Sequence, residues 1–156
     1  MVIFGVDPGT ARCGWGIIET NGANPKALHF GCITTEKTES APNRLLLLYT
    51  TLSMLLAKHK PDIMSIEEIF FARNAKTIIP VGQARGIALL AAAQYKIPVV
   101  SYSPPAVKRI VTGDGRADKK QIQQRITRLL HLEEMPKSDD TADALAIALT
   151  HAFSLT

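Results

Sequence analysis

The sequence has few cysteines and no long apolar run. Its 156 residues include two cysteines and four histidines, and none of them has the spacing of a zinc site. Two cysteines suit reduced thiols in the cytoplasm better than a disulfide framework. The longest apolar stretch, residues 87–93, is far too short to span a bilayer, and the N-terminal residues lack the basic region of a signal peptide. We therefore expect a cytoplasmic protein with no membrane partner.

The composition is that of a globular domain with a basic surface. Hydrophobic residues make up 46% of the chain and charged residues 21%, and a chain of this length can bury the core of one domain. The 18 basic and 14 acidic residues give a net charge of +4. A basic surface favours polyanionic partners, although many lysine-rich proteins share this balance. We predict a single domain over residues 1–156.

Apolar runs and turn residues predict three strands, followed by alternating helices and strands. The short linkers between the first three strands favour an antiparallel meander, and the longer helical linkers favour parallel pairing afterwards. We therefore predict an α/β fold with a five-stranded mixed β-sheet flanked by α-helices. The expected strands are 2–6, 14–19, 28–34, 63–67 and 98–102, and the expected helices are 40–59, 79–95 (with Pro80 in its first turn), 104–111, 119–130 and 139–153.

Four acidic residues occupy positions where burial makes a charge costly. Asp7 ends the apolar run 2–6, Glu67 follows 63–66, and Asp143 lies among small apolar residues three positions after Asp140. A turn explains Asp7 equally well, a strand end explains Glu67, and helix capping explains Asp140, but capping does not explain Asp143. Carboxylates from distant segments favour a shared Mg²⁺ or Mn²⁺. Two such ions suit phosphodiester hydrolysis.

Four sequence blocks, in order and at matching spacing, resemble those of the RuvC family of Holliday-junction resolvases, which are RNase H-like nucleases. The resemblance covers residues 2–153. The blocks are Gly5-Val6-Asp7-Pro8-Gly9-Thr10 with Gly14-Trp15-Gly16, then Ile66-Glu67-Glu68-Ile69-Phe70-Phe71-Ala72-Arg73-Asn74, then Gly82-Gln83-Ala84-Arg85-Gly86, and finally Asp140-Thr141-Ala142-Asp143-Ala144-Leu145-Ala146.

The resemblance implies a catalytic, metal-binding set of Asp7, Glu67, Asp140 and Asp143. It implies Mg²⁺ as the cofactor, with two ions in each active site and Mn²⁺ able to substitute. It also selects Glu67 over the adjacent Glu68, whereas Asp139 beside Asp140 leaves open which of those two binds metal. The resemblance also implies a homodimer that nicks four-way DNA junctions symmetrically and works with the RuvA–RuvB branch-migration complex.

Basic and aromatic residues are expected to contact the DNA. The resemblance implies roles in DNA binding and cleavage for Lys108 and Lys119, and Lys119 near the acids suits stabilisation of phosphate charge. It also points to Phe70 as a ring that stacks at the junction, although a phenylalanine is more often a core residue. For each lysine the alternative is a solvated helix face. The other expected phosphate contacts are Arg73, Lys76, Arg109, Arg116 and Lys120.

The helix expected around residues 79–95 is the predicted dimer interface. It is rich in glycine and alanine, and small residues let two helices approach closely, although the same composition suits packing on a sheet. A twofold DNA substrate is matched most simply by a C₂ dimer with two identical sites. We therefore expect a homodimer that makes paired cuts.

Two competing hypotheses come from related folds. The turn Asp7-Pro8-Gly9-Thr10 also resembles the first phosphate loop of actin-like ATPases, but those proteins need a second lobe and a second phosphate loop, for which this chain has no room. The YqgF-like branch of the RNase H-like proteins is the other hypothesis. Residues 70–74 and the closing Asp-x-x-Asp argue against it.

Overall fold

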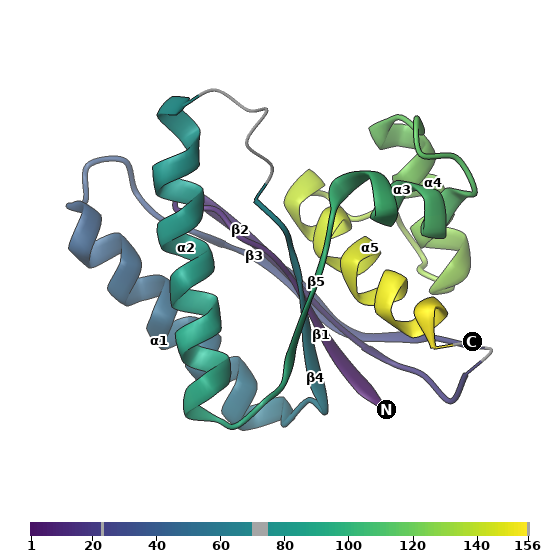
Figure 1. Ribbon diagram of the computed structural model, residues 1–156, viewed down its shortest axis with the longest axis horizontal. Helices are drawn as coiled ribbons and strands as arrows, with labels where there is room; N and C mark the ends of the chain where they lie inside the picture. The colour runs from purple at the N-terminus through teal and green to yellow at the C-terminus, as the bar shows by residue number, and fades with distance from the viewer. Residues whose placement is uncertain (23, 70–74, 156) are drawn as a thin grey trace.

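The computed structural model describes residues 1–22, 24–69 and 75–155, with only the backbone of residues 75–77 (Figure 1). Five strands and five helices make up this part of the chain, with three strands first and three helices last. The strands are β1 (Val2–Asp7), β2 (Arg12–Glu19), β3 (Lys26–Thr34), β4 (Ile63–Glu67) and β5 (Val99–Tyr102). The helices are α1 (Ala41–His59), α2 (Ala75–Gln94), α3 (Pro104–Thr112), α4 (Lys119–Leu129) and α5 (Asp139–Ser154).

The strands form one mixed sheet in the order β3-β2-β1-β4-β5. The first three strands pair antiparallel, as a meander with short connections. β4 then pairs parallel to β1, and β5 pairs parallel to β4, since a helical crossover can return the chain to the same edge of a sheet. The predicted five-stranded mixed sheet is confirmed.

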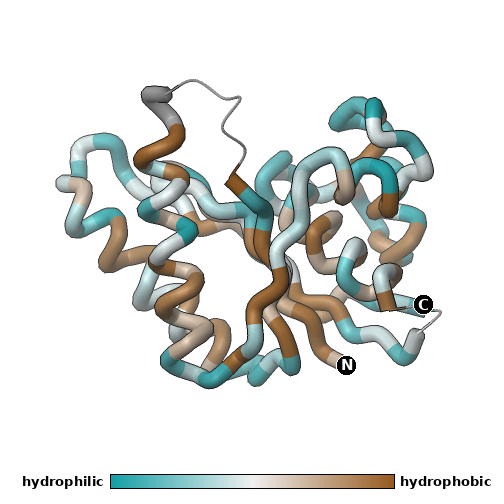
Figure 2. The backbone as a smooth tube through the Cα atoms, in the orientation of Figure 1, coloured by the Kyte–Doolittle hydropathy of each residue, from teal (hydrophilic) through white to brown (hydrophobic). Residues whose placement is uncertain are grey.

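The helices cover both faces of the sheet. α1 and α2 lie on one face, and α3, α4 and α5 lie on the other (Figure 1). Side chains along each strand alternate between the two cores: Val6 and Ile66 are buried on the α1–α2 side, whereas Ile3 is buried on the α5 side. Figure 2 shows the apolar segments running through the central strands, with hydrophilic residues at the turns. Each face therefore has its own apolar core.

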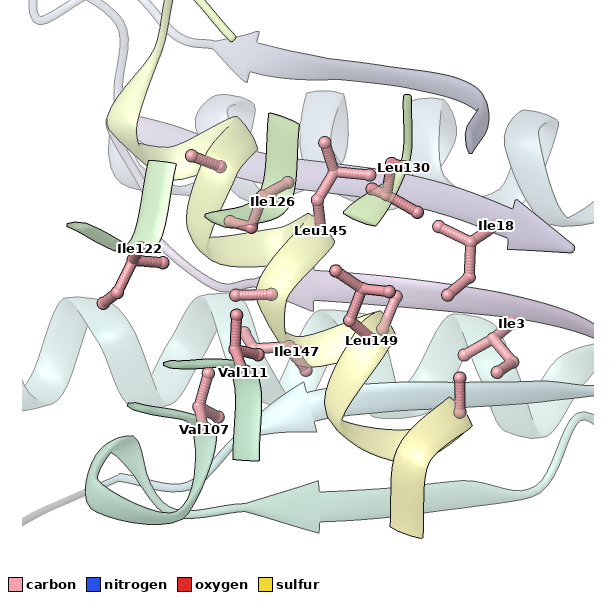
Figure 3. Packing of buried hydrophobic residues seen from close by; sticks show 14 of the residues in the cluster. Ile3, Ile18, Val107, Val111, Ile122, Ile126, Leu130, Leu145, Ile147 and Leu149 are labelled. Carbon is pink, nitrogen blue, oxygen red and sulfur yellow. The ribbon is translucent and has the colours of Figure 1, made fainter. Parts of the chain in front are cut away.

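The core on the α5 side gathers apolar residues from three helices and the sheet. Leu145 and Leu149 of α5 pack between the sheet and the shorter helices, and Ile3 and Ile18 reach them from β1 and β2 (Figure 3). α4 adds Ile122, Ile126 and, just beyond its end, Leu130. α5 is therefore held in place by apolar contacts on both sides.

The helix boundaries follow the sequence signals, with one difference. Ser40 caps α1 by accepting a hydrogen bond from the Asn43 amide, and the other predicted elements begin and end within two residues of their expected bounds. α2, however, begins at Ala75, so Pro80 lies inside the helix and not in its first turn. A proline there removes one hydrogen bond, to the carbonyl four residues earlier. None of the helices in the described part of the chain is long and apolar enough to cross a membrane.

Candidate active site

Asp7 and Glu67 end two neighbouring parallel strands. The register pairs Val6 of β1 with Ile66 of β4, so the next residues, Asp7 and Glu67, lie side by side at the same end of the sheet. Val6 and Ile66 are buried on the α1–α2 side. Since successive side chains of a strand point to opposite faces, both carboxylates belong to the face that α5 covers.

Two glycines of the sheet leave room for the backbone of α5 at this end. A Cβ on Gly5 would stand 2.1 Å from the Ala144 carbonyl oxygen, and a Cβ on Gly14 would stand 1.8 Å from the Asp140 carbonyl oxygen. Gly14 is also the register partner of Asp7. The missing side chains thus let the backbone of α5 touch β1 and β2, which brings its first two turns over the strand ends.

Glu67 and Asp143 share a cavity with two lysines. Lys108 of α3 and Lys119 of α4 line this cavity of about 110 Å³ together with the two acids. The rest of its lining is apolar and consists of Pro104, Val107, Ile122, Ala146 and Ile147. Two of the four predicted acids and both lysines that the sequence analysis linked to cleavage therefore meet in one place.

Asp140 is paired with an arginine that the sequence analysis did not single out. Arg12 Nε donates to the Asp140 carboxylate at 2.6 Å, and Arg12 Nη2 donates to Ser138 Oγ at 2.8 Å. The hydrogen bond to Asp140 and its charge raise the pKa of Arg12. Burial raises the pKa of the neighbouring Cys13 to about 12, and the charges of Asp7 and Asp140 add to that shift. The Asp140 carboxylate thus lies beside a cation on the β2 side of α5.

Asp139 has different partners. Lys119 Nζ lies 3.2 Å from one carboxylate oxygen of Asp139, and Gln123 Nε2 donates to the other at 2.8 Å. The hydrogen bond to Asp139 is the main cause that raises the pKa of Lys119, and the charges of Asp143 and Asp140 raise it further. Lys119 therefore stands among three carboxylates, and Asp139 is directed toward α4.

The acids match a divalent metal in ligand type, but their side chains do not form a coordination shell. Hard carboxylate oxygens without thiolate are the ligands of Mg²⁺ and Mn²⁺. Across residues 1–22, 24–69 and 75–155, no group of three or more His, Cys, Asp or Glu side chains is gathered closely enough to hold a metal ion. The structure thus offers suitable ligands on one surface, with Asp140 held by Arg12.

The predicted DNA-contacting residues fall into three groups. Lys108 and Lys119 line the acidic cavity, and Arg109, Arg116 and Lys120 are exposed around it on α3, the following loop and α4. Lys76 lies in the first turn of α2. Phe70 and Arg73 lie outside the described residues.

One further contact was missed from the sequence. Arg85 of α2 donates a hydrogen bond to the backbone carbonyl of Glu67. The signal that could have found it is the block Gly82–Gly86, in which Arg85 is the charged residue. Arg12 had no comparable signal beyond its place near the Asp7 turn.

The fold and the acids define a class of protein before any comparison. A mixed sheet in the order β3-β2-β1-β4-β5, with acids at the ends of β1 and β4 and on the helix that crosses them, is the architecture of the RNase H-like nucleases. The model of the family described as "Crossover junction endodeoxyribonuclease RuvC" matches residues 3–151. This chain belongs to the RuvC family.

Relatives and solved structures agree with that assignment. The RuvC of Desulfitobacterium hafniense is 50% identical over 155 residues, which cover 99% of this chain and 94% of that protein. The RuvC of Heliobacterium modesticaldum is 49% identical over 156 residues, covering 100% and 96%. The structure of Thermus thermophilus RuvC in complex with a Holliday junction substrate superposes with a TM-score of 0.94 at 36% identity, and the match covers 99% of this chain and 94% of that one. The predicted family and fold are confirmed.

Proposed function

We propose that this chain resolves four-way DNA junctions during recombination and repair, by paired and symmetric phosphodiester hydrolysis within a single nuclease domain over residues 1–156. Membership of the RuvC family supports the reaction, and the Thermus relative solved with a Holliday junction supports the substrate. The observation that carries the assignment to particular residues is the cavity shared by Glu67, Asp143, Lys108 and Lys119. A basic surface beside clustered acids suits a phosphate-ester substrate.

Asp7, Glu67, Asp140 and Asp143 are the proposed metal ligands, with two Mg²⁺ ions per site and Mn²⁺ as a substitute. Bound divalent ions would supply an activated water and stabilise the leaving oxygen. The strand-end placement of Asp7 and Glu67 supports the assignment, as does the cavity that Asp143 shares with Glu67. When metal binds, the Asp140 carboxylate would leave Arg12 and coordinate the ion. Asp139 would not bind metal and would keep its hydrogen bonds from Lys119 and Gln123.

Lys119 is proposed to act directly in cleavage. Its ammonium group stands among Asp139, Asp140 and Asp143, which raise its pKa and keep it charged. A cation there would stabilise the negative charge that develops on the scissile phosphate. Lys108 lines the same cavity and would bind the phosphates on either side of the cut.

The remaining DNA contacts would extend from this cavity along the basic surface. Exposed Arg109, Arg116 and Lys120 are proposed to bind backbone phosphates, which position the DNA without reading its sequence. Phe70, Arg73 and Lys76 are also proposed to contact the junction, with Phe70 stacking on exposed bases.

A homodimer is proposed as the working form, with α2 as its interface. The large apolar side chains of Ile79 and Leu90 on α2 are 69% and 56% exposed, and a Cβ on Gly86 would meet nothing within 4 Å. An apolar, small-residue helix surface of this kind favours close pairing of two copies. The dimer is proposed to act in the cytoplasm, together with the RuvA–RuvB branch-migration complex.

The proposal is tested with a synthetic four-way junction and Mg²⁺. Asp7→Asn, Glu67→Gln and Asp143→Asn should each abolish nicking and leave junction binding intact, because affinity comes from the basic surface. Glu36→Gln, an exposed acid outside the site, is the matched control and should nick as the unchanged protein does. Normal nicking by any of the three variants would remove that residue from the catalytic set. ATP hydrolysis without nicking would favour the actin-like hypothesis instead.

A further inference from the structure

Arg85 is a charged residue on the inner side of α2. Its neighbours on that side, Ala84 and Ala88, are buried against the sheet, and Arg85 is itself half-buried. The guanidinium makes two hydrogen bonds: Nη1 donates to the backbone carbonyl of Glu67, and Nη2 donates to Ser101 Oγ at 2.8 Å. A single side chain of α2 therefore joins the ends of β4 and β5.

Arg85 contacts Glu67 from the face of the sheet that α2 covers. The Glu67 carboxylate lies on the α5 side, where it lines the cavity with Asp143, whereas α2 covers the opposite face (Figure 1). Arg85 thus holds the backbone carbonyl of Glu67. Glu67 is the last residue of β4, and the next backbone hydrogen bond along the chain, from the Glu68 amide to the Tyr102 carbonyl, measures 2.9 Å.

The placement of Arg85 is energetically demanding, which indicates a specific role. Arg85 is only half exposed, and taking a guanidinium out of water costs free energy unless its donors are paired. A half-buried guanidinium is retained where its planar, forked donors match fixed acceptors. The two acceptors here belong to adjacent strands, so the guanidinium fixes their ends relative to each other.

We infer that Arg85 is a positioning residue for Glu67, which fixes the end of β4 from the far side of the sheet and so sets the direction in which the Glu67 carboxylate enters the acidic cavity. This inference rests on the proposed role of Glu67 as a metal ligand. Supporting contacts of this kind control how a first ligand is presented to a metal. The alternative is that Arg85 stabilises the fold and nothing more.

Metal binding without DNA separates the two roles. The change Arg85→Ala should weaken Mn²⁺ binding to the free protein, and slow junction nicking, by roughly 10- to 100-fold, as loss of a supporting contact typically does. Junction affinity measured without metal should stay unchanged. Arg85→Lys keeps one donor and should recover part of both losses. Ser101→Ala removes only the β5 contact and should have a smaller effect than Arg85→Ala.

A matched control accounts for general loss of stability. Ala91→Gly changes a buried residue of the same helix and lowers helix stability without touching Glu67. Its Tm should fall, while Mn²⁺ binding by the folded protein stays normal. An Arg85→Ala protein that binds Mn²⁺ as tightly as Ala91→Gly would overturn the inference. If Arg85→Ala does not fold, wild-type Mn²⁺ affinity in Arg85→Lys overturns it in the same way.

Glu67→Gln, measured in parallel, separates this inference from the proposed function. If Glu67→Gln loses Mn²⁺ binding and nicking while Arg85→Ala keeps both, the positioning role is wrong and the metal site stands. If Glu67→Gln itself binds Mn²⁺ and nicks normally, the proposed site is wrong, and the role of Arg85 falls with it.

Discussion

The contact between Gly14 and α5 gives a prediction whose size follows from the structure. In Gly14→Ala the new Cβ would stand 1.8 Å from the Asp140 carbonyl oxygen and 2.3 Å from its carbon. Both neighbours are backbone atoms, so no flexible side chain can turn aside. Since a Cβ contact shorter than 3.0 Å is essentially never observed, the first turn of α5 and β2 must separate by at least about 1.2 Å.

That displacement should reduce catalysis more than stability. Overpacking of this kind destabilises a fold by about 1–3 kcal/mol, which a domain of ordinary stability tolerates. A misplacement of about 1 Å in a catalytic group can cost roughly 100-fold in rate, and the moving turn carries Asp140. We therefore expect Gly14→Ala to fold, with a lowered Tm, and to nick junctions roughly 100-fold more slowly.

Urea unfolding and single-turnover nicking of a labelled junction measure the two effects separately. Gly115→Ala is the control, because its Cβ would meet its nearest neighbour, the Pro105 carbonyl oxygen, at an ordinary 3.8 Å. It should leave stability nearly unchanged. A Gly14→Ala protein with normal stability and a normal nicking rate would refute the close approach of α5 to β2. Loss of stability alone would refute the link from that approach to catalysis.

Three further predictions concern single side chains. Asp140→Asn should lose nicking activity and Asp139→Asn should keep most of it, and the opposite pattern in the junction assay would move the metal ligand to Asp139. A thiol reagent at about pH 8 should modify Cys32 and spare Cys13, because burial raises the pKa of Cys13 to about 12; rapid modification of both thiols in the folded protein would contradict this. Burial lowers the pKa of His151, so the unfolded chain takes up a proton before the folded one, and the free energy of unfolding should fall as the pH drops below about 6.5. In urea titrations, the free energy of unfolding of His151→Gln should fall less at low pH than that of the unchanged protein. The same pH dependence in both proteins would show that His151 does not cause the fall.

The strands and helices were predictable because their signals are local. The apolar runs at Val2–Val6 and Ile63–Ile66 end at polar or turn residues, and the leucine stripe of α1 puts Leu48, Leu52 and Leu56 on one buried face. The start of α2 was not predictable from the sequence. Proline is common in the first turn of a helix, so Pro80 placed the expected start near residue 79 and the earlier helical residues were not recognised.

The proposed acids could be singled out from their apolar sequence surroundings, and their partners could not. Asp7 and Glu67 follow apolar strands, and Asp143 lies in an apolar stripe, so the sequence alone marks them as unusual. The Arg12–Asp140 pair joins residues 128 positions apart, and Arg85 reaches from α2 on one face of the sheet to Glu67 at the end of β4. Such contacts depend on the assembled fold and leave no periodic signal.

Asp7, Glu67 and Asp143 are three of the four proposed ligands of the catalytic metal, and the proposed function depends on their binding it. Crystals of the protein with a junction and Mn²⁺, measured at a wavelength where manganese scatters anomalously, test it directly, because the signal locates the ion without reference to activity. We predict anomalous density bounded by the three carboxylates, with Lys119 beside it. Manganese density elsewhere, with all three carboxylates out of coordination range in a protein that still nicks junctions, would contradict the account.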